Sequence, residues 1–369
     1  MKAGDLSALQ PVRKPAAHRG AGGNPPNRFE KLHIEPDADW NPEEDPLPRT
    51  QFLKDRSVTI ISSNDSPDIP FEASLNPYRG CEHGCIYCYA RPTHEHLGFS
   101  AGLDFETRIM VKENAPKLLR AELSSPRWKP KVISLSSATD PYQPIERRLK
   151  LTRGCLEVLA EFRNPVTVVT KNNLITRDLD LLSELASYHA AAVFISVTTL
   201  DTKLRNIMEP RTSPPEARLA TIHALGKAGI PVGVMVAPVI PGLTEHEIPS
   251  IIEAARDYGA QFACHEILRL PLAVAPLFEQ WLMTHFPQRK EKVLNRIRAL
   301  RGGKLNDSRF SVRMRGEGLF AEQISRMFRT VCRKAGLGED GPDLLAVAFR
   351  RSAGKQLELG LSKSESDSE

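Results

Sequence analysis

The chain has 369 residues, of which 41% are hydrophobic and 26% are charged, so it is long enough to bury a sizeable core in a main domain with appendages. It contains no run of 18 apolar residues, which argues against a membrane-spanning helix, and its first 23 residues lack the apolar segment of a secretion signal. Six cysteines are too few for a disulfide scaffold in a chain of this size. We therefore expect a cytoplasmic protein without a membrane partner, in which clustered cysteines bind a metal.

The composition divides the chain into four predicted regions. The first 50 residues hold eight prolines and four glycines, so 1–55 is expected to be a flexible arm. The segment 56–272 is the predicted core, 273–352 a basic helical extension, and 353–369 a polar tail.

Short β-branched runs alternate with amphipathic segments from residue 71 onward. Six strands are predicted, at Phe71–Asn76, Val132–Ser136, Val166–Thr170, Val193–Thr198, Val232–Val239 and Phe262–Leu268. The predicted helices between them are Arg147–Phe162, Leu179–Ser187, Pro215–Ala228 and Glu247–Tyr258. Repeated strand–helix units imply a parallel sheet with right-handed crossovers. The sequence thus predicts an α/β fold, a partial (β/α)6 barrel with its chemistry at the carboxyl ends of the strands, plus a helical C-terminal extension.

The extension after Pro271 is predicted to be helical and basic. Three helical patterns cover Val274–Phe286, Arg289–Leu300 and Leu319–Lys334. From residue 289 to 334 there are fourteen Lys and Arg against four Asp and Glu, a local charge of +10. Because the whole chain carries +5, the remainder is at −5, and the mean hides a strongly basic surface.

Three cysteines, Cys81, Cys85 and Cys88, follow one another at spacings that let their sulfurs converge on one centre. Thiolates are soft ligands that favour iron–sulfur clusters, zinc or copper(I). Three ligands leave one iron of a four-iron cluster open, which suits substrate binding. Zinc is the alternative, and it usually takes a fourth protein ligand, which His83, His94 or His96 would supply.

The C-x3-C-x2-C motif, with Tyr87 before its last cysteine and a position after the first strand of a six-unit βα core, resembles the radical S-adenosylmethionine (SAM) superfamily. The resemblance covers roughly residues 71 to 270. It implies a [4Fe-4S] cluster on the three cysteines, whose open iron holds SAM. One electron, from a reductant such as flavodoxin or ferredoxin, then yields a 5′-deoxyadenosyl radical that abstracts hydrogen from a substrate. The wider stretch 76–91 is similar to uncharacterised bacterial enzymes near the spore photoproduct lyase-like branch.

The same resemblance implies that SAM is bound by residues at the strand ends. These are Tyr87, Ser136, Thr139, Asp140, Lys171, Ser196, Thr198, Glu209, Arg218 and Gly242. In this reading Lys171 pairs with the methionine carboxylate, and Gly242 lets the backbone approach adenine. Three parts of this set have a purely structural alternative. In that alternative, the residues after the second strand form a polar turn, Lys171 is a solvated loop end, and the segment after Thr212 is an N-capped helix with exposed charges.

Two features indicate a nucleic-acid substrate. The lyase-like branch includes an enzyme that repairs a thymine dimer in DNA, and Arg309, Arg313 and Arg315 are closely spaced in the basic extension, as in phosphate-binding surfaces. The alternative is that these basic helices balance an acidic core. The tail residues Gln356, Leu357, Leu359 and Leu361 resemble the short peptide that docks on the DNA sliding clamp, so the clamp is a second predicted partner.

One position departs from the lyase pattern. Ser137 occupies the place of the cysteine that returns a hydrogen atom in the lyase, and a serine O–H bond is too strong for that role. The remaining weak catalytic candidates are Tyr142, as a radical relay, and Cys264, on the sixth strand. A rival hypothesis is a non-catalytic nucleic-acid-binding module stabilised by zinc or a cluster at the same cysteines.

Overall fold

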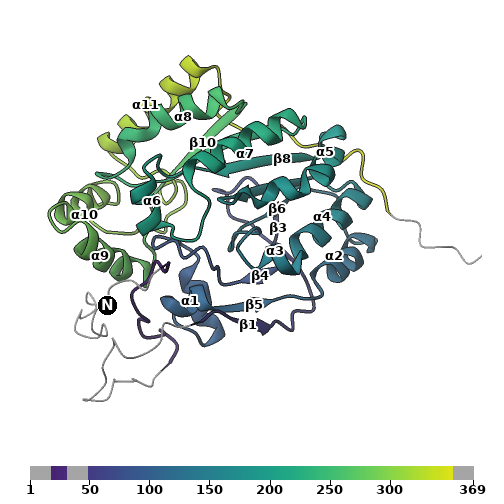
Figure 1. Ribbon diagram of the computed structural model, residues 1–369, viewed down its shortest axis with the longest axis horizontal. Helices are drawn as coiled ribbons and strands as arrows, with labels where there is room; N and C mark the ends of the chain where they lie inside the picture. The colour runs from purple at the N-terminus through teal and green to yellow at the C-terminus, as the bar shows by residue number, and fades with distance from the viewer. Residues whose placement is uncertain (1–17, 31–48, 352–369) are drawn as a thin grey trace, which may run out of the picture.

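The computed structural model describes residues 18–30 and 49–351, and a seven-stranded sheet forms the centre of that part of the chain (Figure 1). The strand order is β10-β9-β8-β7-β6-β3-β2. Six strands are parallel: β3 (Ala73–Leu75), β6 (Ile133–Leu135), β7 (Val166–Thr170), β8 (Ala191–Ser196), β9 (Val232–Val239) and β10 (Phe262–Ile267). β2 (Ile61–Ser63) pairs antiparallel with β3. The sheet is open between β10 and β2, so the predicted partial barrel of six parallel strands is confirmed.

Helices cover the outer face of this sheet (Figure 1). The covering helices are α2 (Ala115–Ser124), α4 (Leu151–Phe162), α5 (Leu179–Ser187), α7 (Pro215–Lys227), α8 (Ile248–Asp257) and α11 (Leu319–Ala335). Shorter elements join them to the strands: α3 (Glu146–Leu149), η3 (Asn173–Asp178), α6 (Thr202–Met208) and η4 (Glu245–Glu247). The predicted helix from 147 to 162 is two helices, because Lys150 between them has a φ of +53°.

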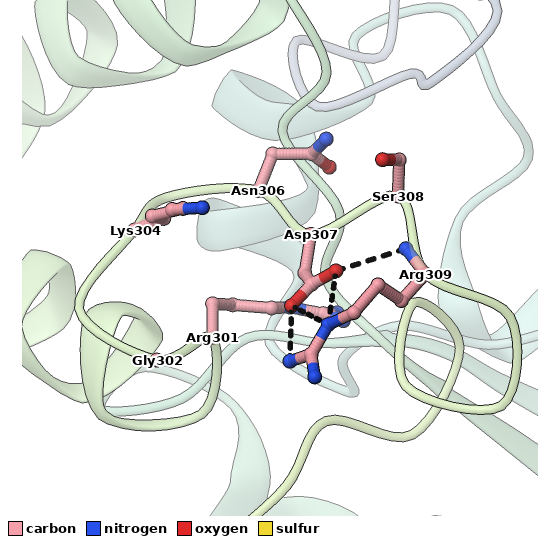
Figure 2. A pocket seen from close by; sticks show the side chains of 7 residues that line it. All are labelled: Arg301, Gly302, Lys304, Asn306, Asp307, Ser308 and Arg309. Atoms are coloured by element: carbon pink, nitrogen blue, oxygen red, sulfur yellow. Dashed lines mark hydrogen bonds and ion pairs between the residues drawn. The ribbon is translucent and has the colours of Figure 1, made fainter.

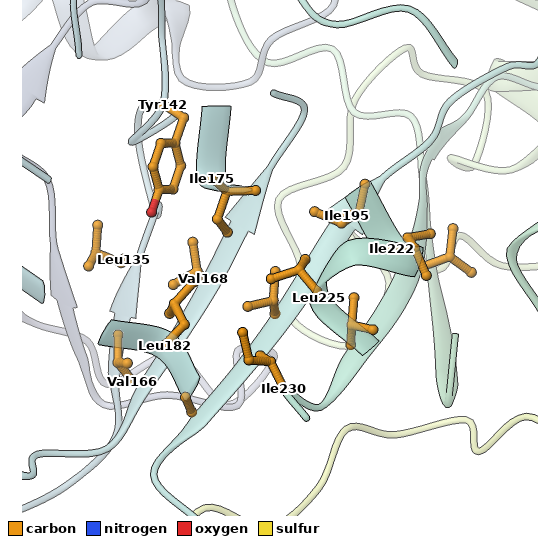
Figure 3. Packing of buried hydrophobic residues seen from close by; sticks show 14 of the residues in the cluster. Leu135, Tyr142, Val166, Val168, Ile175, Leu182, Ile195, Ile222, Leu225 and Ile230 are labelled. Carbon is orange, nitrogen blue, oxygen red and sulfur yellow. The ribbon is translucent and has the colours of Figure 1, made fainter. Parts of the chain in front are cut away.

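The core lies between the parallel strands and these helices. Alternate residues of β7 are buried, so Val166 and Val168 face the helices while the residues between them face the barrel interior. Figure 3 shows Leu182 of α5 and Leu225 of α7 packed over these strands, and both are fully buried. Burial of each such side chain stabilises the fold by about 1.5–3 kcal/mol.

The described residues also form a second sheet of three strands, two of which come before the cysteine motif in the sequence and one after it. β5 (Arg108–Val111) pairs in parallel with β1 (Gln51–Lys54) and antiparallel with β4 (Tyr78–Arg79). Between β4 and β5 lie the cysteine loop, η2 (Arg91–Leu97) and α1 (Leu103–Thr107). These strands have two to four residues, too few for a periodic pattern, so the sequence analysis did not predict them.

The C-terminal extension packs on the barrel rather than beside it. α9 (Val274–His285) and α10 (Lys290–Ala299) share a hydrophobic cluster with Ile86 and Tyr87 of the cysteine loop. Trp281 of α9 also donates its indole N–H to the carbonyl oxygen of Ile207 over 2.9 Å. Within the described ranges, no helix combines the length and apolar character needed to cross a lipid bilayer.

His265 on β10 gives the fold a testable pH dependence. Its ring packs 4.2 Å from that of Phe328 on α11, and burial, with Arg315 and Arg329 nearby, lowers the pKa of His265 from 6.5 to about 4. The unfolded chain therefore binds a proton that the folded chain does not, between about pH 6.5 and 4, and stability falls as the pH falls through this window. Between pH 6.5 and 4, the free energy of unfolding should therefore fall by roughly 3 kcal/mol more in the wild type than in His265→Phe.

Chemical unfolding at a series of pH values measures this difference directly. His223→Phe is the matched control, because His223 is exposed and should leave the pH dependence unchanged. Equal pH dependence in the wild type and His265→Phe would contradict the assignment.

Candidate active site

The three motif cysteines lie on one loop that follows β4 at the carboxyl end of the sheet. Cys81 and Cys85 are buried and Cys88 is partly buried. The Cys81 N–H donates to the carbonyl oxygen of Phe105 over 2.9 Å, and the Cys88 N–H donates to that of Cys85 over 3.2 Å. Gly84 turns the loop with a φ of +68°, a conformation that favours glycine. The loop thus holds three thiols in a protected place.

The surroundings of the three thiols fit a metal group that is bound through thiolate sulfur. Burial raises the pKa of all three thiols, and neighbouring thiols raise the pKa of Cys81 and Cys85 further. Cations offset this effect: Lys171 acts on Cys85 and Cys88, and Arg91 acts on Cys88. In the part of the chain that the structure describes, no group of three His, Cys, Asp or Glu side chains is arranged around a single metal ion. The three cysteines remain the soft donor set of the site.

A buried ion pair anchors the loop from behind. Arg91 and Glu106 are both fully buried, with 2.6 Å between Nη2 and Oε1. The guanidinium also donates to four loop carbonyls, those of Gly84, Cys85, Ala101 and Gly102. A pair with this many partners has its charges and donors satisfied without water. It therefore fixes the backbone that carries Cys85.

Residues 18–30, part of the predicted flexible arm, are bonded to this loop. The N–H groups of Gly20 and Ala21 donate to the two carboxylate oxygens of Glu106 over 3.0 and 2.9 Å. Further along, Arg28 forms an ion pair of 2.7 Å with Glu95 of η2. This segment covers the cysteine loop, an arrangement that the proline and glycine content of the region did not predict.

The close approach of this segment requires a glycine. A Cβ atom at Gly20 would lie 1.8 Å from the carbonyl oxygen of Gly84, whereas one at Gly23 would meet nothing within 4 Å. Gly20→Ala should therefore release residues 18–30 and lose two buried hydrogen bonds, worth about 1 kcal/mol each. Amide hydrogen exchange in this segment should rise about tenfold or more. Gly23→Ala is the control, and equal exchange in the two variants would show that the segment is not held this way.

Asp140 connects the second strand of the barrel to the cysteine loop. Its carboxylate accepts from the Thr170 hydroxyl (2.7 Å) and the Lys171 N–H (2.8 Å), and lies 3.3 Å from Nδ1 of His83. Burial alone would raise the pKa of Asp140, but His83 and these donors lower it. The other His83 nitrogen lies 3.2 Å from the Asn172 amide. Asp140 is thus an ionised anchor, and His83 is engaged on both sides.

Glu209 is the centre of a second buried network, which joins β7, β8 and α7. Its carboxylate lies 3.1 Å from the Lys171 ammonium and pairs with the guanidinium of Arg218. It also accepts from the Tyr87 and Thr198 hydroxyls. Burial alone would raise the pKa of Glu209, yet the two cations and these donors lower it well below its usual value. The structure therefore brings five predicted residues into one charged cluster.

Lys171 also ties this network to the strand ends. Its ammonium donates to the hydroxyls of Ser196 (2.7 Å) and Thr198 (2.9 Å) and to the Ala237 carbonyl (2.9 Å). It retains 15% exposure of its side chain, whereas Arg218 retains 1%. Lys171 is therefore not a solvated loop end, and Arg218 is not an exposed charge on the next helix, because both side chains are largely buried.

The other predicted cosubstrate residues are more dispersed. Ser136 follows β6 and has a φ of +128°, and the Thr139 hydroxyl donates to the Tyr78 carbonyl over 3.3 Å. Gly242 has a φ of +85°, and a Cβ atom there would lie 3.4 Å from the backbone of Val293 in α10. Packing against α10 thus accounts for this glycine without an adjacent adenine.

The structure separates the two weak catalytic candidates. Tyr142 is fully buried in the main hydrophobic cluster, where Figure 3 shows it beside Ile175, and its hydroxyl donates to Asp178 over 3.1 Å. This contact gives Tyr142 a structural role, not one as a relay at the thiols. Cys264 is partly exposed on β10, and burial followed by the nearby Glu266 raises its pKa.

Sequence reasoning missed the polar residues at the mouth of the barrel. The Arg269 guanidinium lies 4.3 Å from the ring centre of Tyr89, whose hydroxyl donates to the Ser137 carbonyl over 2.7 Å. Arg269 also lies 3.9 Å from Glu266. The only available signal was strand alternation, which places Glu266 on the same face as Cys264.

The three arginines predicted to bind nucleic acid are not equivalent. Arg309 pairs with Asp307 and Glu317, and Arg313 pairs with Asp68 over 2.7 Å. Arg315 is exposed. The predicted clamp peptide, residues 356–361, lies outside the described residues.

Comparisons with known proteins identify the family. Residues 75–255 match the model of the radical SAM superfamily. An uncharacterized protein of Mycobacterium tuberculosis is 44% identical over 177 residues, 48% of this chain and 52% of that protein, so the chain spans about half the length of this relative. An uncharacterized protein of Methanocaldococcus jannaschii is 29% identical over 248 residues, 67% of this chain and 88% of that protein.

A solved structure shares the fold. Spore photoproduct lyase complexed with dinucleoside spore photoproduct superposes with a TM-score of 0.56 and 16% identity over 78% of this chain and 81% of that chain. This likeness concerns the fold alone. Together with the family match and the geometry of the cysteine loop, it leads to one conclusion: residues 75–255 form a radical SAM domain, and the fold around it is similar to that of spore photoproduct lyase.

Proposed function

We propose that this protein is a radical SAM enzyme in which Cys81, Cys85 and Cys88 hold a [4Fe-4S] cluster and the neighbouring strand ends bind SAM. The observation that supports it most is the placement of three protected thiols on one loop, beside charged groups from the segments that follow β6, β7 and β8 at one edge of the sheet. When bound, the cluster and SAM supply a one-electron cleavage of the sulfonium bond that releases a 5′-deoxyadenosyl radical.

The chain's own residues would protect and orient these groups. The Arg91–Glu106 pair fixes the loop backbone, and residues 20 and 21 cover it, which limits the access of water. Tyr87 is buried in the same loop, and its hydroxyl bond to Glu209 fixes its ring. His83 is held by Asp140 through Nδ1 and by Asn172 through Nε2, so coordination of a metal by either ring nitrogen would cost one of these contacts.

Lys171 is the proposed partner of the SAM carboxylate. It is the more exposed of the two cations that pair with Glu209, and it lies at the carboxyl end of β7. Its bonds to Ser196 and Thr198 fix the ammonium in place before a ligand arrives, which lowers the ordering cost of binding. Glu209 and Arg218 would act through Lys171 and not by direct contact.

The proposed substrate is nucleic acid. The basic extension supports it through the charge of +10 between residues 289 and 334, and the structurally similar lyase is complexed with a dinucleoside photoproduct. Ser137 stands where the lyase-like pattern has a cysteine, so hydrogen return by the same route is not part of the proposal. The reaction also needs a one-electron donor, for which a flavodoxin or a ferredoxin is proposed.

Deuterium transfer tests the substrate class. The reconstituted enzyme, SAM and a reductant are incubated with deuterated DNA, deuterated RNA or buffer, and the 5′-deoxyadenosine is analysed by mass spectrometry. Deuterium in the product from one nucleic acid is the expected result. Product formation with no deuterium from either polymer would remove nucleic acid as the substrate and leave the radical SAM assignment in place.

A further inference from the structure

A polar pocket of about 250 Å³ opens in the connection between α10 and α11, outside the cysteine site (Figure 2). Its lining consists of Arg301, Gly302, Lys304, Asn306, Asp307, Ser308 and Arg309. Figure 2 shows the labelled side chains surrounding one space, with Arg301 extending toward Asp307 and Arg309. Only Arg309 of this set was singled out by the sequence.

Arg301 gives the pocket a buried cationic base. Its side chain is 1% exposed, and it donates to the carbonyls of Val312 and Arg313 over 2.8 Å each and to that of Leu268 over 2.9 Å. Its Nε–H has no partner among the described residues. Burial, followed by Arg269, lowers the pKa of Arg301 to about 10. A bound anion would stabilise the charge of Arg301 and would accept a hydrogen bond from its Nε–H.

The lining is net positive. Arg309 donates to both carboxylate oxygens of Asp307, over 3.0 and 3.2 Å from Nε, and these bonds lower the pKa of Asp307 to about 2. The acid thus orients Arg309 and also acts on Arg301 and Lys304, but the three cations of the lining outnumber this one carboxylate. Lys304 forms no ion pair with any residue that the structure describes. A concave surface with a net positive charge favours a phosphate group.

An exposed aromatic ring stands next to the pocket. Phe310 is 55% exposed, and the Arg313 guanidinium lies 4.9 Å from its ring centre. The loop is fixed on the far side, because Asp68 accepts from the Ser311 N–H (2.6 Å) and from Arg313 (2.7 Å). A cationic groove beside a fixed, exposed aromatic ring is the arrangement by which proteins bind single-stranded nucleic acids.

The buried base of the pocket lies at the same edge of the sheet as the cysteines. Arg301 bonds to the carbonyls of Ile267 and Leu268, where β10 ends. The cysteine loop lies at the carboxyl ends of the parallel strands, so a strand held in the pocket approaches the barrel mouth.

We propose that this pocket binds a backbone phosphate of a nucleic-acid strand, with Phe310 stacking on an adjacent base. The substrate class rests on the proposed function, and the pocket adds the place where the strand is held. The proposed ligand is a phosphodiester within a polymer. Free phosphate has similar chemistry, and the test below distinguishes the two ligands.

The test uses the full chain and a fluorescein-labelled 12-nucleotide oligo-dT, with affinity measured by anisotropy at several salt concentrations. Lys304→Ala and Phe310→Ala should each weaken binding about tenfold, and only Lys304→Ala should reduce the slope of log K against log salt, by about 0.7. Lys292→Ala, at an exposed position of α10, and Leu319→Ala are matched controls for charge and for apolar surface. Arg301 is left intact because it holds four backbone carbonyls.

Three outcomes overturn the proposal: unchanged affinity in both variants, a wild type that binds no oligonucleotide, or a wild type in which only inorganic phosphate binds and Lys304→Ala weakens that binding. Release of 5′-deoxyadenosine is measured on the same protein preparations in the absence of nucleic acid. Because neither variant touches the cysteine site, this release should persist. Its persistence with unchanged oligonucleotide affinity would refute the pocket alone, whereas its absence from the wild type would refute the proposed function.

Discussion

Cys85→Ser is expected to abolish both iron binding and SAM cleavage after anaerobic reconstitution. The substitution replaces a soft thiolate ligand with a hydroxyl and leaves two cysteines in a loop that offers three. Cys81→Ser and Cys88→Ser should have the same effect, since the three thiols act as one donor set. Iron content per chain, absorption near 400 nm and 5′-deoxyadenosine yield measure the result.

Cys332→Ala provides the matched control for this experiment. Cys332 is a fully buried thiol in α11, and burial raises its pKa to about 11, so it remains a protonated core side chain. Its replacement should cost about 1 kcal/mol of stability and leave iron content unchanged. Full iron content in any of the three serine variants would contradict the assigned ligands.

Glu209→Leu is expected to destabilise the protein by about 3–5 kcal/mol, because it leaves the buried Arg218 without a counter-charge. Lys171 loses the same partner and keeps only its bonds to Ser196, Thr198 and the Ala237 carbonyl. Glu209→Gln retains most of the hydrogen bonds and should show a smaller loss. Urea unfolding of the apoprotein separates this effect from cofactor binding.

Asp257→Leu is the control for a charge pair at the surface. Asp257 is 61% exposed and pairs with the adjacent Arg256, so its replacement should change stability by less than about 0.5 kcal/mol. Equal losses in Glu209→Leu and Asp257→Leu would show that the Glu209 network does not organise the strand ends.

Elements with a strong hydrophobic period could be predicted from the sequence. β7 and β9 begin and end at the predicted residues, because alternating or continuous branched side chains fill a buried sheet. The helices of the barrel follow for the same reason. The interruption at Lys150 could not be predicted, since it depends on one left-handed residue within an otherwise continuous apolar pattern.

The connections of the site could be predicted only in part. Strand ends in a parallel sheet meet at one edge, which is why Lys171 and Thr198 were foreseen near each other. The bonds from Gly20 to Glu106 join residues 86 positions apart, and no local pattern marks either partner. The close spacing of Arg309 and Arg313 in the sequence did not reveal that both form ion pairs with acidic residues of the same chain. A run of basic residues does not show which acidic side chains lie near it in the fold.

The most direct test of the central claim is the release of 5′-deoxyadenosine by the anaerobically reconstituted protein with SAM and a chemical reductant. A brown protein with about four irons per chain should form 5′-deoxyadenosine in amounts that depend on both SAM and reductant. A colourless protein that holds one zinc ion and forms no 5′-deoxyadenosine would contradict the assignment and favour a non-catalytic nucleic-acid-binding module.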